Sequence, residues 1–125
     1  MAHFKVVLPG FPPTTNNLYR SGKRGLRYMS TEYRKWKAGM VPYIQESVET
    51  SLPDKTPFCL EIALYGIDRR SDISNRVKAM EDAMVESGVV PDDRWCDRCV
   101  VARLKGDGRK ETVVYAYTLE DDDGS

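Results

Sequence analysis

The stretch FCLEIALY, residues 58–65, decides the fold, because its two alternating sets of side chains differ sharply. One set is entirely apolar and consists of Phe58, Leu60, Ile62 and Leu64. The other set is mixed and consists of Cys59, Glu61, Ala63 and Tyr65. Successive side chains of a β-strand point to opposite faces of its sheet. The stretch therefore predicts a strand whose apolar set faces the core.

The segment after this strand predicts a helix over about residues 73–87. Apolar side chains recur there at spacings of three and four, at Ile73, Val77, Met80 and Met84. At about 100° per residue these four lie within about 60° of one another and form a stripe for burial. Gly88 follows as the C-terminal stop of the helix.

The rest of the chain supplies further strands and one more helix. Strands are expected over residues 3–8, 96–104 and 112–119, and the last two are joined through Gly106-Asp107-Gly108. A helix is expected from Ser30 or Thr31 to about Val48, and Pro42 within it predicts a kink or a break. Its apolar stripe is Tyr33, Trp36, Met40, Ile44 and Val48. The proline-rich run 9–17 excludes regular structure, and a short strand near residues 26–29 would add a hairpin. The order β-α-β-α-β-β indicates an α+β fold, a small mixed sheet with two helices.

Length and composition favour one globular domain over residues 1–125. The chain has 125 residues, 41% of them apolar, and its 19 basic and 19 acidic side chains cancel. No apolar run approaches the roughly 20 residues that span a bilayer, and no signal peptide begins the chain, so we expect a cytoplasmic protein. The acidic tail, residues 120–125, is expected to be disordered. Basic residues predominate in the first 50 positions, which suits a polyanionic partner but also many other proteins.

The polar side of the second helix carries the residues with chemical potential. Asn75, Lys78 and Asp82 lie within about 60° of one another, nearly opposite the apolar stripe. Asp72 precedes this helix and the pair Asp92-Asp93 follows it, so carboxylates surround a position where a hard cation such as Mg²⁺ would bind. Three ordinary roles also fit these residues: an N-cap for Asp72, a surface ion pair between Lys78 and Asp82, and a turn at Asp92-Asp93.

The order of these residues resembles the signature of the RusA family of Holliday-junction resolvases. The matching run is Asp72-x-x-Asn75-x-x-Lys78-x-x-x-Asp82-Ala83, then Gly88-Val89-x-x-Asp92-Asp93, and it continues without a gap to Asp97. The segments Leu8-Pro9, Pro12-Pro13-Thr14, Asn16-Asn17 and Tyr28-Met29-Ser30 are also similar to the family's N-terminal region. The resemblance covers most of the chain.

This resemblance implies a small homodimeric endonuclease that cuts four-way DNA junctions by paired, symmetric nicks. It implies Mg²⁺ as cofactor, with Mn²⁺ able to substitute, and neither an organic cofactor nor a membrane partner. The implied catalytic residues are Asp72, Lys78 and Asp93, of which Asp72 and Asp93 bind the metal with Asp82 as a further ligand. Ser74, Asn75, Asp82 and Asp92 would support the site. Lys78 would stabilise the extra negative charge of the phosphorane-like transition state.

One position departs from the family pattern and leaves two other functions open. The family's second Asp of its D-x-D pair is Ser74 in this chain, and a neutral hydroxyl is a poor Mg²⁺ ligand. Asp82, Asp92 and Asp68 are the candidates to supply the missing charge. The first alternative is a protein of the same fold that binds branched DNA without cutting it. The second is an unrelated α+β interaction module whose carboxylates are surface decoration.

Basic and aromatic residues are the candidates for DNA contact. Phosphate contacts are expected from Arg20, Lys23, Arg24, Arg27, Arg34, Lys35, Lys37, Arg69, Arg70 and Arg76. Stacking on bases opened at the junction centre is the role considered for Phe11, Tyr19 and Trp95. Trp95 is the best of the three, with a place in the core or in a dimer interface as its alternative. Two symmetric cuts need two sites related by a two-fold axis, so a homodimer is expected.

Overall fold

The computed structural model describes residues 2–14, 19–21 and 27–119, and its centre is a four-stranded sheet. The strands are β1 (His3–Pro9), β4 (Phe58–Tyr65), β5 (Cys96–Leu104) and β6 (Glu111–Thr118), in the order β1-β6-β4-β5. β4 and β5 run parallel, whereas the β1–β6 and β4–β6 pairs are antiparallel. The predicted mixed sheet and α+β class are confirmed.

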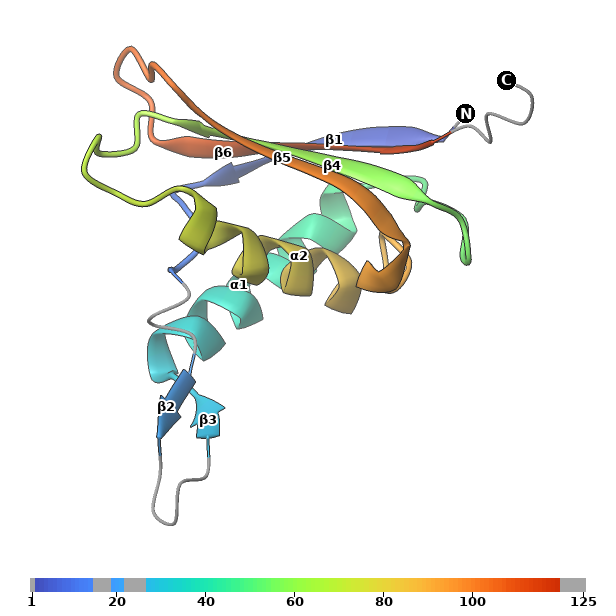
Figure 1. Ribbon diagram of the computed structural model, residues 1–125, viewed down its shortest axis with the longest axis horizontal. Coiled ribbons are helices and arrows are strands. Elements are labelled where there is room, and N and C mark those ends of the chain that lie inside the picture. Colours follow the sequence, from blue (N-terminus) through green and yellow to red (C-terminus); the bar gives the residue numbers. More distant parts are fainter. Residues whose placement is uncertain (1, 15–18, 22–26, 120–125) are drawn as a thin grey trace.

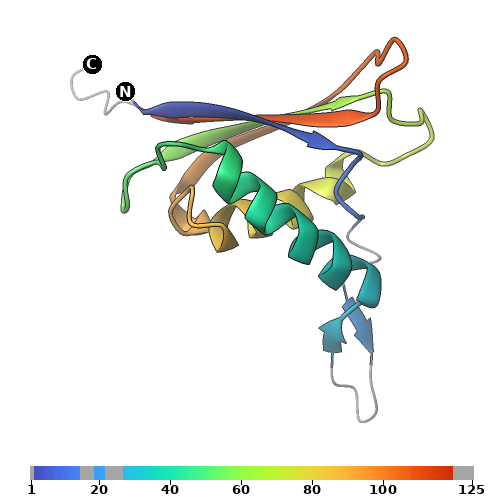
Figure 2. The ribbon, with the colours of Figure 1, turned by 180° about the vertical axis from the view of Figure 1, so that it is seen from behind.

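Two helices lie on the same face of this sheet, α1 (Thr31–Ser47) and α2 (Val77–Glu86), as Figures 1 and 2 show. A small hairpin of β2 (Tyr19–Ser21) and β3 (Arg27–Met29) precedes α1. Short 3₁₀ helices lie at Ser74–Arg76, before α2, and at Asp93–Trp95, before β5. Within the described ranges, neither helix is both long enough and apolar enough to cross a membrane.

The core forms between the sheet and the helices, as the sequence periods predict. All four apolar side chains of β4 are at most 2% exposed. Met80 and Met84 of α2 are fully buried, and Ile73 and Val77 pack against the same core with partial exposure. Burying each large apolar side chain contributes about 1.5–3 kcal/mol, so this layer supplies most of the favourable free energy of folding.

Helix α1 begins where the sequence predicts and continues through Pro42. Of the kink or break predicted there, the break is wrong. Ser30 is the N-cap, and its hydroxyl accepts a hydrogen bond from the Tyr33 amide at 3.2 Å. Proline costs the helix the bond that residue 42 would donate to the Ala38 carbonyl. Pro42 and Ala38 are both exposed, so water can hydrogen-bond that carbonyl instead.

The link between β5 and β6 passes close to the end of β4, because β4 lies between these two strands in the sheet. Gly66 follows β4 with a φ of +80°, and a Cβ there would lie 2.0 Å from the Arg109 carbonyl oxygen. A Cβ on Gly106 would lie 2.3 Å from the same oxygen. Only glycine at both positions permits this approach, which holds the loop after β4 against the end of β5.

Candidate active site

Asp72 stands at the end of the loop that leads into α2 and binds the start of the helix. Its Oδ1 accepts hydrogen bonds from the Ser74 amide at 3.1 Å and the Ser74 hydroxyl at 2.7 Å. Its Oδ2 accepts one from the Asn75 side-chain amide at 2.9 Å. The carboxylate thus satisfies an otherwise unpaired backbone amide, as the N-cap alternative predicted. Ser74 occupies the position next to Asp72 that the family pattern gives to a second carboxylate.

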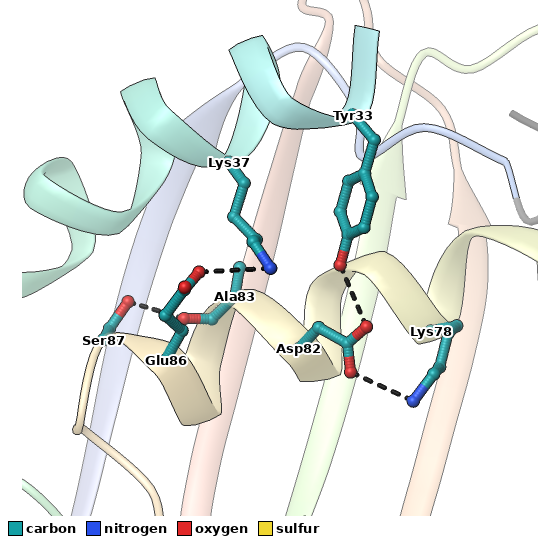
Figure 3. Close-up of polar contacts among 7 residues, drawn as sticks. All are labelled: Tyr33, Lys37, Lys78, Asp82, Ala83, Glu86 and Ser87. Carbon is teal, nitrogen blue, oxygen red and sulfur yellow. Dashed lines mark hydrogen bonds and ion pairs between the residues drawn. The ribbon is translucent and has the colours of Figure 1, made fainter. Parts of the chain in front are cut away.

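Lys78 and Asp82 form the ion pair that their spacing predicts, and α1 takes part in it. The Lys78 Nζ lies 3.0 Å from the Asp82 Oδ1, and the Tyr33 hydroxyl donates a 2.9 Å hydrogen bond to the Asp82 Oδ2 (Figure 3). Tyr33 is fully buried, and the Asp82 side chain is only 22% exposed. The polar side of α2 is therefore partly covered by α1, which the sequence does not predict. Both oxygens of Asp82 have partners inside the protein, which favours its supporting role.

A second ion pair, one turn further along α2, joins this helix to α1 (Figure 3). The Lys37 Nζ lies 3.2 Å from a Glu86 oxygen and 4.9 Å from the centre of the Tyr33 ring. The Lys37 side chain is only 17% exposed, which favours a role between the helices over phosphate contact. Arg34 and Lys35, its neighbours on α1, are exposed.

Asp92 caps the 3₁₀ helix that carries Asp93. Its Oδ1 accepts a 3.0 Å hydrogen bond from the Arg94 amide and lies 3.6 Å from the Arg94 Nε. The amide hydrogen bond, followed by a hydrogen bond with the Asp93 side chain, lowers the pKa of Asp92. The turn role foreseen for this pair is therefore present at Asp92, whereas the Asp93 side chain is exposed.

Glu81 belongs to this polar region, although the sequence reasoning missed it. Burial raises its pKa, and so does the nearby negative charge of Asp93 and, more weakly, of Asp82, while Lys78 lowers it. Lys78, Asp82 and Asp93 therefore each lie within electrostatic reach of Glu81. The available signal was the spacing, because Glu81 follows Lys78 by three positions on the helix surface.

The described part of the chain holds no group of three or more His, Cys, Asp or Glu side chains arranged for a metal ion. Asp72 lies with Ser74 and Asn75, whereas Asp93 lies within electrostatic reach of Glu81. The donor chemistry still suits Mg²⁺, which commonly binds proteins through one or two carboxylates and takes its other ligands from water and substrate phosphates.

A basic hollow of about 340 Å³ lies at the end of β4 and β5, beside the Asp72 loop. Arg69, Arg103 and Lys105 line it together with Gly66 and Gly106. Arg103 also donates hydrogen bonds to the carbonyls of Asp68 at 2.6 Å and Ser71 at 2.9 Å, which ties the loop to β5. The sequence reasoning included Arg69 but missed Arg103 and Lys105, which lie about 35 positions later and join it only through the parallel β4–β5 pairing.

The two other arginines of this region, Arg70 and Arg76, differ in their surroundings. Arg70 is exposed, with its Nε 3.6 Å from an Asp68 oxygen. Arg76 instead donates hydrogen bonds to the Pro12 carbonyl at 2.7 Å and the Ser71 hydroxyl at 3.4 Å, and partial burial lowers its pKa. Arg76 therefore anchors the proline-rich segment to the start of α2, which competes with the DNA contact expected for it.

Several expected DNA contacts fall on parts of the chain that are only partly described. Lys23 and Arg24 lie outside the described residues, as does the acidic tail 120–125, and only the backbone is described for Tyr19, Arg20 and Arg27. Phe11 and Trp95 both pack against the core with partial exposure, which agrees with the core alternative for Trp95.

Comparison with known proteins agrees with this fold and this order of residues. No curated protein matches the chain. The model of the family described as endodeoxyribonuclease RusA matches residues 9–115, which include every residue of the Asp72–Asp93 run. The match also removes the alternative of an unrelated interaction module. The chain belongs to the RusA family, a family of endodeoxyribonucleases that resolve Holliday junctions.

Proposed function

We propose that this protein is a Mg²⁺-dependent endonuclease that resolves four-way DNA junctions by paired, symmetric nicks, acting as a homodimer. Family membership gives the class of nuclease, and the rest is inferred from the site. The observation that carries the proposal is the run Asp72, Asn75, Lys78, Asp82 and Asp93. Within it Lys78 is paired with the Asp82 carboxylate, which the Tyr33 hydroxyl of α1 holds in turn.

Asp72 and Asp93 are the side chains that would hold Mg²⁺. When bound, the metal would lower the pKa of a coordinated water and polarise a phosphoryl oxygen. Each carboxylate is exposed, so each can be reached by a phosphodiester. The Ser74 hydroxyl and the Asn75 amide hold the Asp72 oxygens in place through hydrogen bonds of 2.7 and 2.9 Å.

Lys78 would stabilise the pentacovalent phosphorus that develops during hydrolysis. Its ammonium group is about half exposed and lies 3.0 Å from Asp82, which limits its rotation. The Tyr33 hydroxyl limits the rotation of Asp82 in the same way. A cation fixed before the reaction stabilises developing negative charge without first reorganising, which is where such groups gain their effect.

The basic hollow is the proposed contact for the DNA backbone next to the site. Arg69, Arg103 and Lys105 offer three positive charges beside the loop that ends in Asp72. Contacts of this kind bind phosphates irrespective of base sequence and weaken steeply with salt. We expect the double substitution Arg69→Gln with Lys105→Gln to lower junction affinity about tenfold and to reduce the salt dependence of binding. Arg103 is left in place because it holds the loop.

Binding of junctions without cleavage is the second candidate function. Two observations favour it: the Ser74 hydroxyl donates to Asp72 where the family pattern has a carboxylate, and the described residues contain no group of three metal-binding side chains. Under this alternative, Ser74→Asp should create or increase Mg²⁺-dependent cleavage. The added carboxylate would also repel Asp72, so this variant should melt at a lower temperature without metal and gain stability when Mg²⁺ is added.

The test is a cleavage assay on a labelled synthetic four-way junction, with linear duplex of the same sequence beside it. Reactions contain Mg²⁺, Mn²⁺ or EDTA. Asp93→Asn controls for contaminating nucleases, and Asp107→Asn is the matched control, because Asp107 is exposed and its φ of +49° suits asparagine.

Paired nicks that need the metal, persist in Asp107→Asn and disappear in Asp93→Asn are the result expected of the proposed resolvase. A junction-selective gel shift without any cut would establish the binding alternative. The absence of both cleavage and a selective gel shift would contradict both functions.

A further inference from the structure

The chain reaches Asp72 through a tight turn at Asp68–Ser71, in the loop after β4 (Figure 1). The Ser71 amide donates a 2.9 Å hydrogen bond to the Asp68 carbonyl, and the Arg70 amide donates one of 2.8 Å to the Asp68 Oδ1. Asp68 and Arg70 are exposed, so little apolar packing holds the turn. The direction in which the backbone presents Asp72 therefore depends on what else binds this turn.

Arg103 binds both ends of the turn from β5. Its Nη1 donates a 2.6 Å hydrogen bond to the Asp68 carbonyl, and its Nη2 donates one of 2.9 Å to the Ser71 carbonyl. Arg103 pairs in the sheet with Leu64, which is fully buried, so the backbone that carries the guanidinium belongs to the packed sheet. Because the two donors sit in one planar, rigid fork, they hold both carbonyls in a fixed position relative to β5.

Asp72 is thus held from both sides along the chain. After it, the Ser74 hydroxyl and the Asn75 amide donate to its carboxylate. Before it, the Ser71 carbonyl that accepts from Arg103 belongs to the planar peptide group that joins Ser71 to Asp72. Arg103 therefore restrains the backbone of Asp72, whereas Ser74 and Asn75 restrain its side chain.

The two Arg103 hydrogen bonds contribute little to the stability of the fold. The bond to the Asp68 carbonyl is exposed and the bond to the Ser71 carbonyl is partly buried, so water can replace the guanidinium at both. Their loss should lower the melting temperature by less than about 5 °C. What they restrict is the position of a carboxylate, and a displacement of about 1 Å at a reacting group can lower a rate about 10²-fold.

We propose that Arg103 is a positioning residue of the nuclease, which holds the Asp68–Ser71 turn against β5 and thereby fixes Asp72 where the metal and the phosphodiester meet. The inference rests on the proposed function and adds to it a residue that the run Asp72–Asp93 does not contain. Arg103 also lines the basic hollow, so a direct DNA contact is the competing role.

Lysine at position 103 separates these two roles. Arg103→Lys keeps the positive charge but replaces the two Nη donors by one ammonium nitrogen, which cannot reproduce the fork. Junction affinity should stay within about threefold of the wild type, whereas single-turnover cleavage at saturating junction should slow at least about tenfold. The Mg²⁺ concentration that gives half the maximal rate should rise at least about threefold, because Asp72 is held less firmly.

The matched control is Arg98→Lys, the same replacement at an exposed position on the same strand, near its other end. This variant should match the wild type in rate, affinity and Mg²⁺ dependence. Arg103→Gln loses the charge as well as the fork, so it should lose junction affinity in addition to cleavage rate. Thermal melts followed by circular dichroism check that each variant is folded.

Amide hydrogen exchange, measured residue by residue by NMR on the full chain without metal or DNA, tests the hold on the turn directly. The amides of Arg70, Ser71 and Ser74 make the hydrogen bonds within the turn and to Asp72. They should exchange at least about fivefold faster in Arg103→Lys than in the wild type, and at the wild-type rate in Arg98→Lys. If Arg103→Lys does not fold, Arg103→Gln takes its place in this experiment.

Two results would overturn the proposal. Unchanged exchange in Arg103→Lys would show that the turn does not depend on the fork. A variant that lost junction affinity but cleaved at the wild-type rate once saturated would show that Arg103 is a DNA contact only. A wild type that binds junctions but never cuts them would instead contradict the proposed nuclease, while faster exchange in Arg103→Lys would still show that Arg103 holds the turn.

Discussion

The two sides of α2 differ in what surrounds them and therefore in what they contribute. Met80 and Met84 on one side are fully buried against the sheet. On the other side Lys78 is half exposed, and Asp82 is held by the Tyr33 hydroxyl. A ten-residue helix thus joins a packed layer to a polar row. The contrast indicates that stability and cleavage can be changed independently, by substitutions on opposite sides of one element.

Removing a carboxylate from the polar region should have the largest effect. We expect Asp93→Asn to lower the rate of junction cleavage at least 10³-fold, about 4 kcal/mol in activation free energy. Its side chain is exposed, so the melting temperature should stay within about 2 °C of the wild type. Single-turnover cleavage and a thermal melt of the same sample measure both. A large loss of stability would contradict the separation between the two sides.

The opposite outcome is expected on the buried side. Met84→Ala should lower the free energy of unfolding by about 2–5 kcal/mol, because it leaves a cavity under the sheet. Cleavage per folded molecule at 20 °C should change less than threefold. Urea unfolding measures the stability, and Tyr43→Ala, on exposed α1 surface, is the control with a change near 0.5 kcal/mol. A variant as stable as the wild type would show that this methionine is not a core residue.

Tyr33 is the residue at which the separation should fail. Tyr33→Phe removes the 2.9 Å hydrogen bond to Asp82, at a cost of about 1–2 kcal/mol in stability. It should also lower cleavage several-fold, because Asp82 would hold Lys78 less firmly. A double-mutant cycle with Lys78→Met isolates the second effect: in that background Tyr33→Phe should lose its influence on cleavage but keep its cost in stability. Equal losses in both backgrounds would exclude positioning through Lys78.

Local patterns predicted the sheet and helices well because each has its own period. The alternation in β4 and the three-and-four spacing of Met80 and Met84 both correspond to observed burial. The break predicted at Pro42 is absent, because the cost of a proline depends on whether the unpaired carbonyl faces water. The sequence alone does not reveal this. The hydroxyl of Tyr33 gave no signal either, since its apolar ring fits a core stripe equally well.

The site was harder to predict, because it combines residues that are distant in the sequence. The Lys78–Asp82 pair and the Asp72 cap follow from spacing alone and are present. Arg103 reaches the Asp72 loop only through the parallel β4–β5 pair, whose register no local motif encodes. Glu81 gave no signal beyond its spacing, because at about 100° per residue it projects between the apolar stripe of α2 and the face that carries Asn75, Lys78 and Asp82.

Glu81 lies between the two sides of α2 and should show the smallest effect. Burial, followed by the charges of Asp93 and Asp82, raises its pKa above its unfolded value, so the folded protein disfavours its ionised form at neutral pH. The stability linked to Glu81 is thus complete below about pH 4 and is lost as pH rises through the raised pKa.

Glu81→Gln should therefore be more stable than the wild type at pH 7 and equal to it near pH 3. The difference at pH 7 should be less than about 0.5 kcal/mol, because the Glu81 side chain is half exposed. Melts across this range, with the exposed Glu49→Gln as control, measure the difference. A difference that grew toward acidic pH would show that Glu81 is stabilised as an anion and belongs wholly to the polar side.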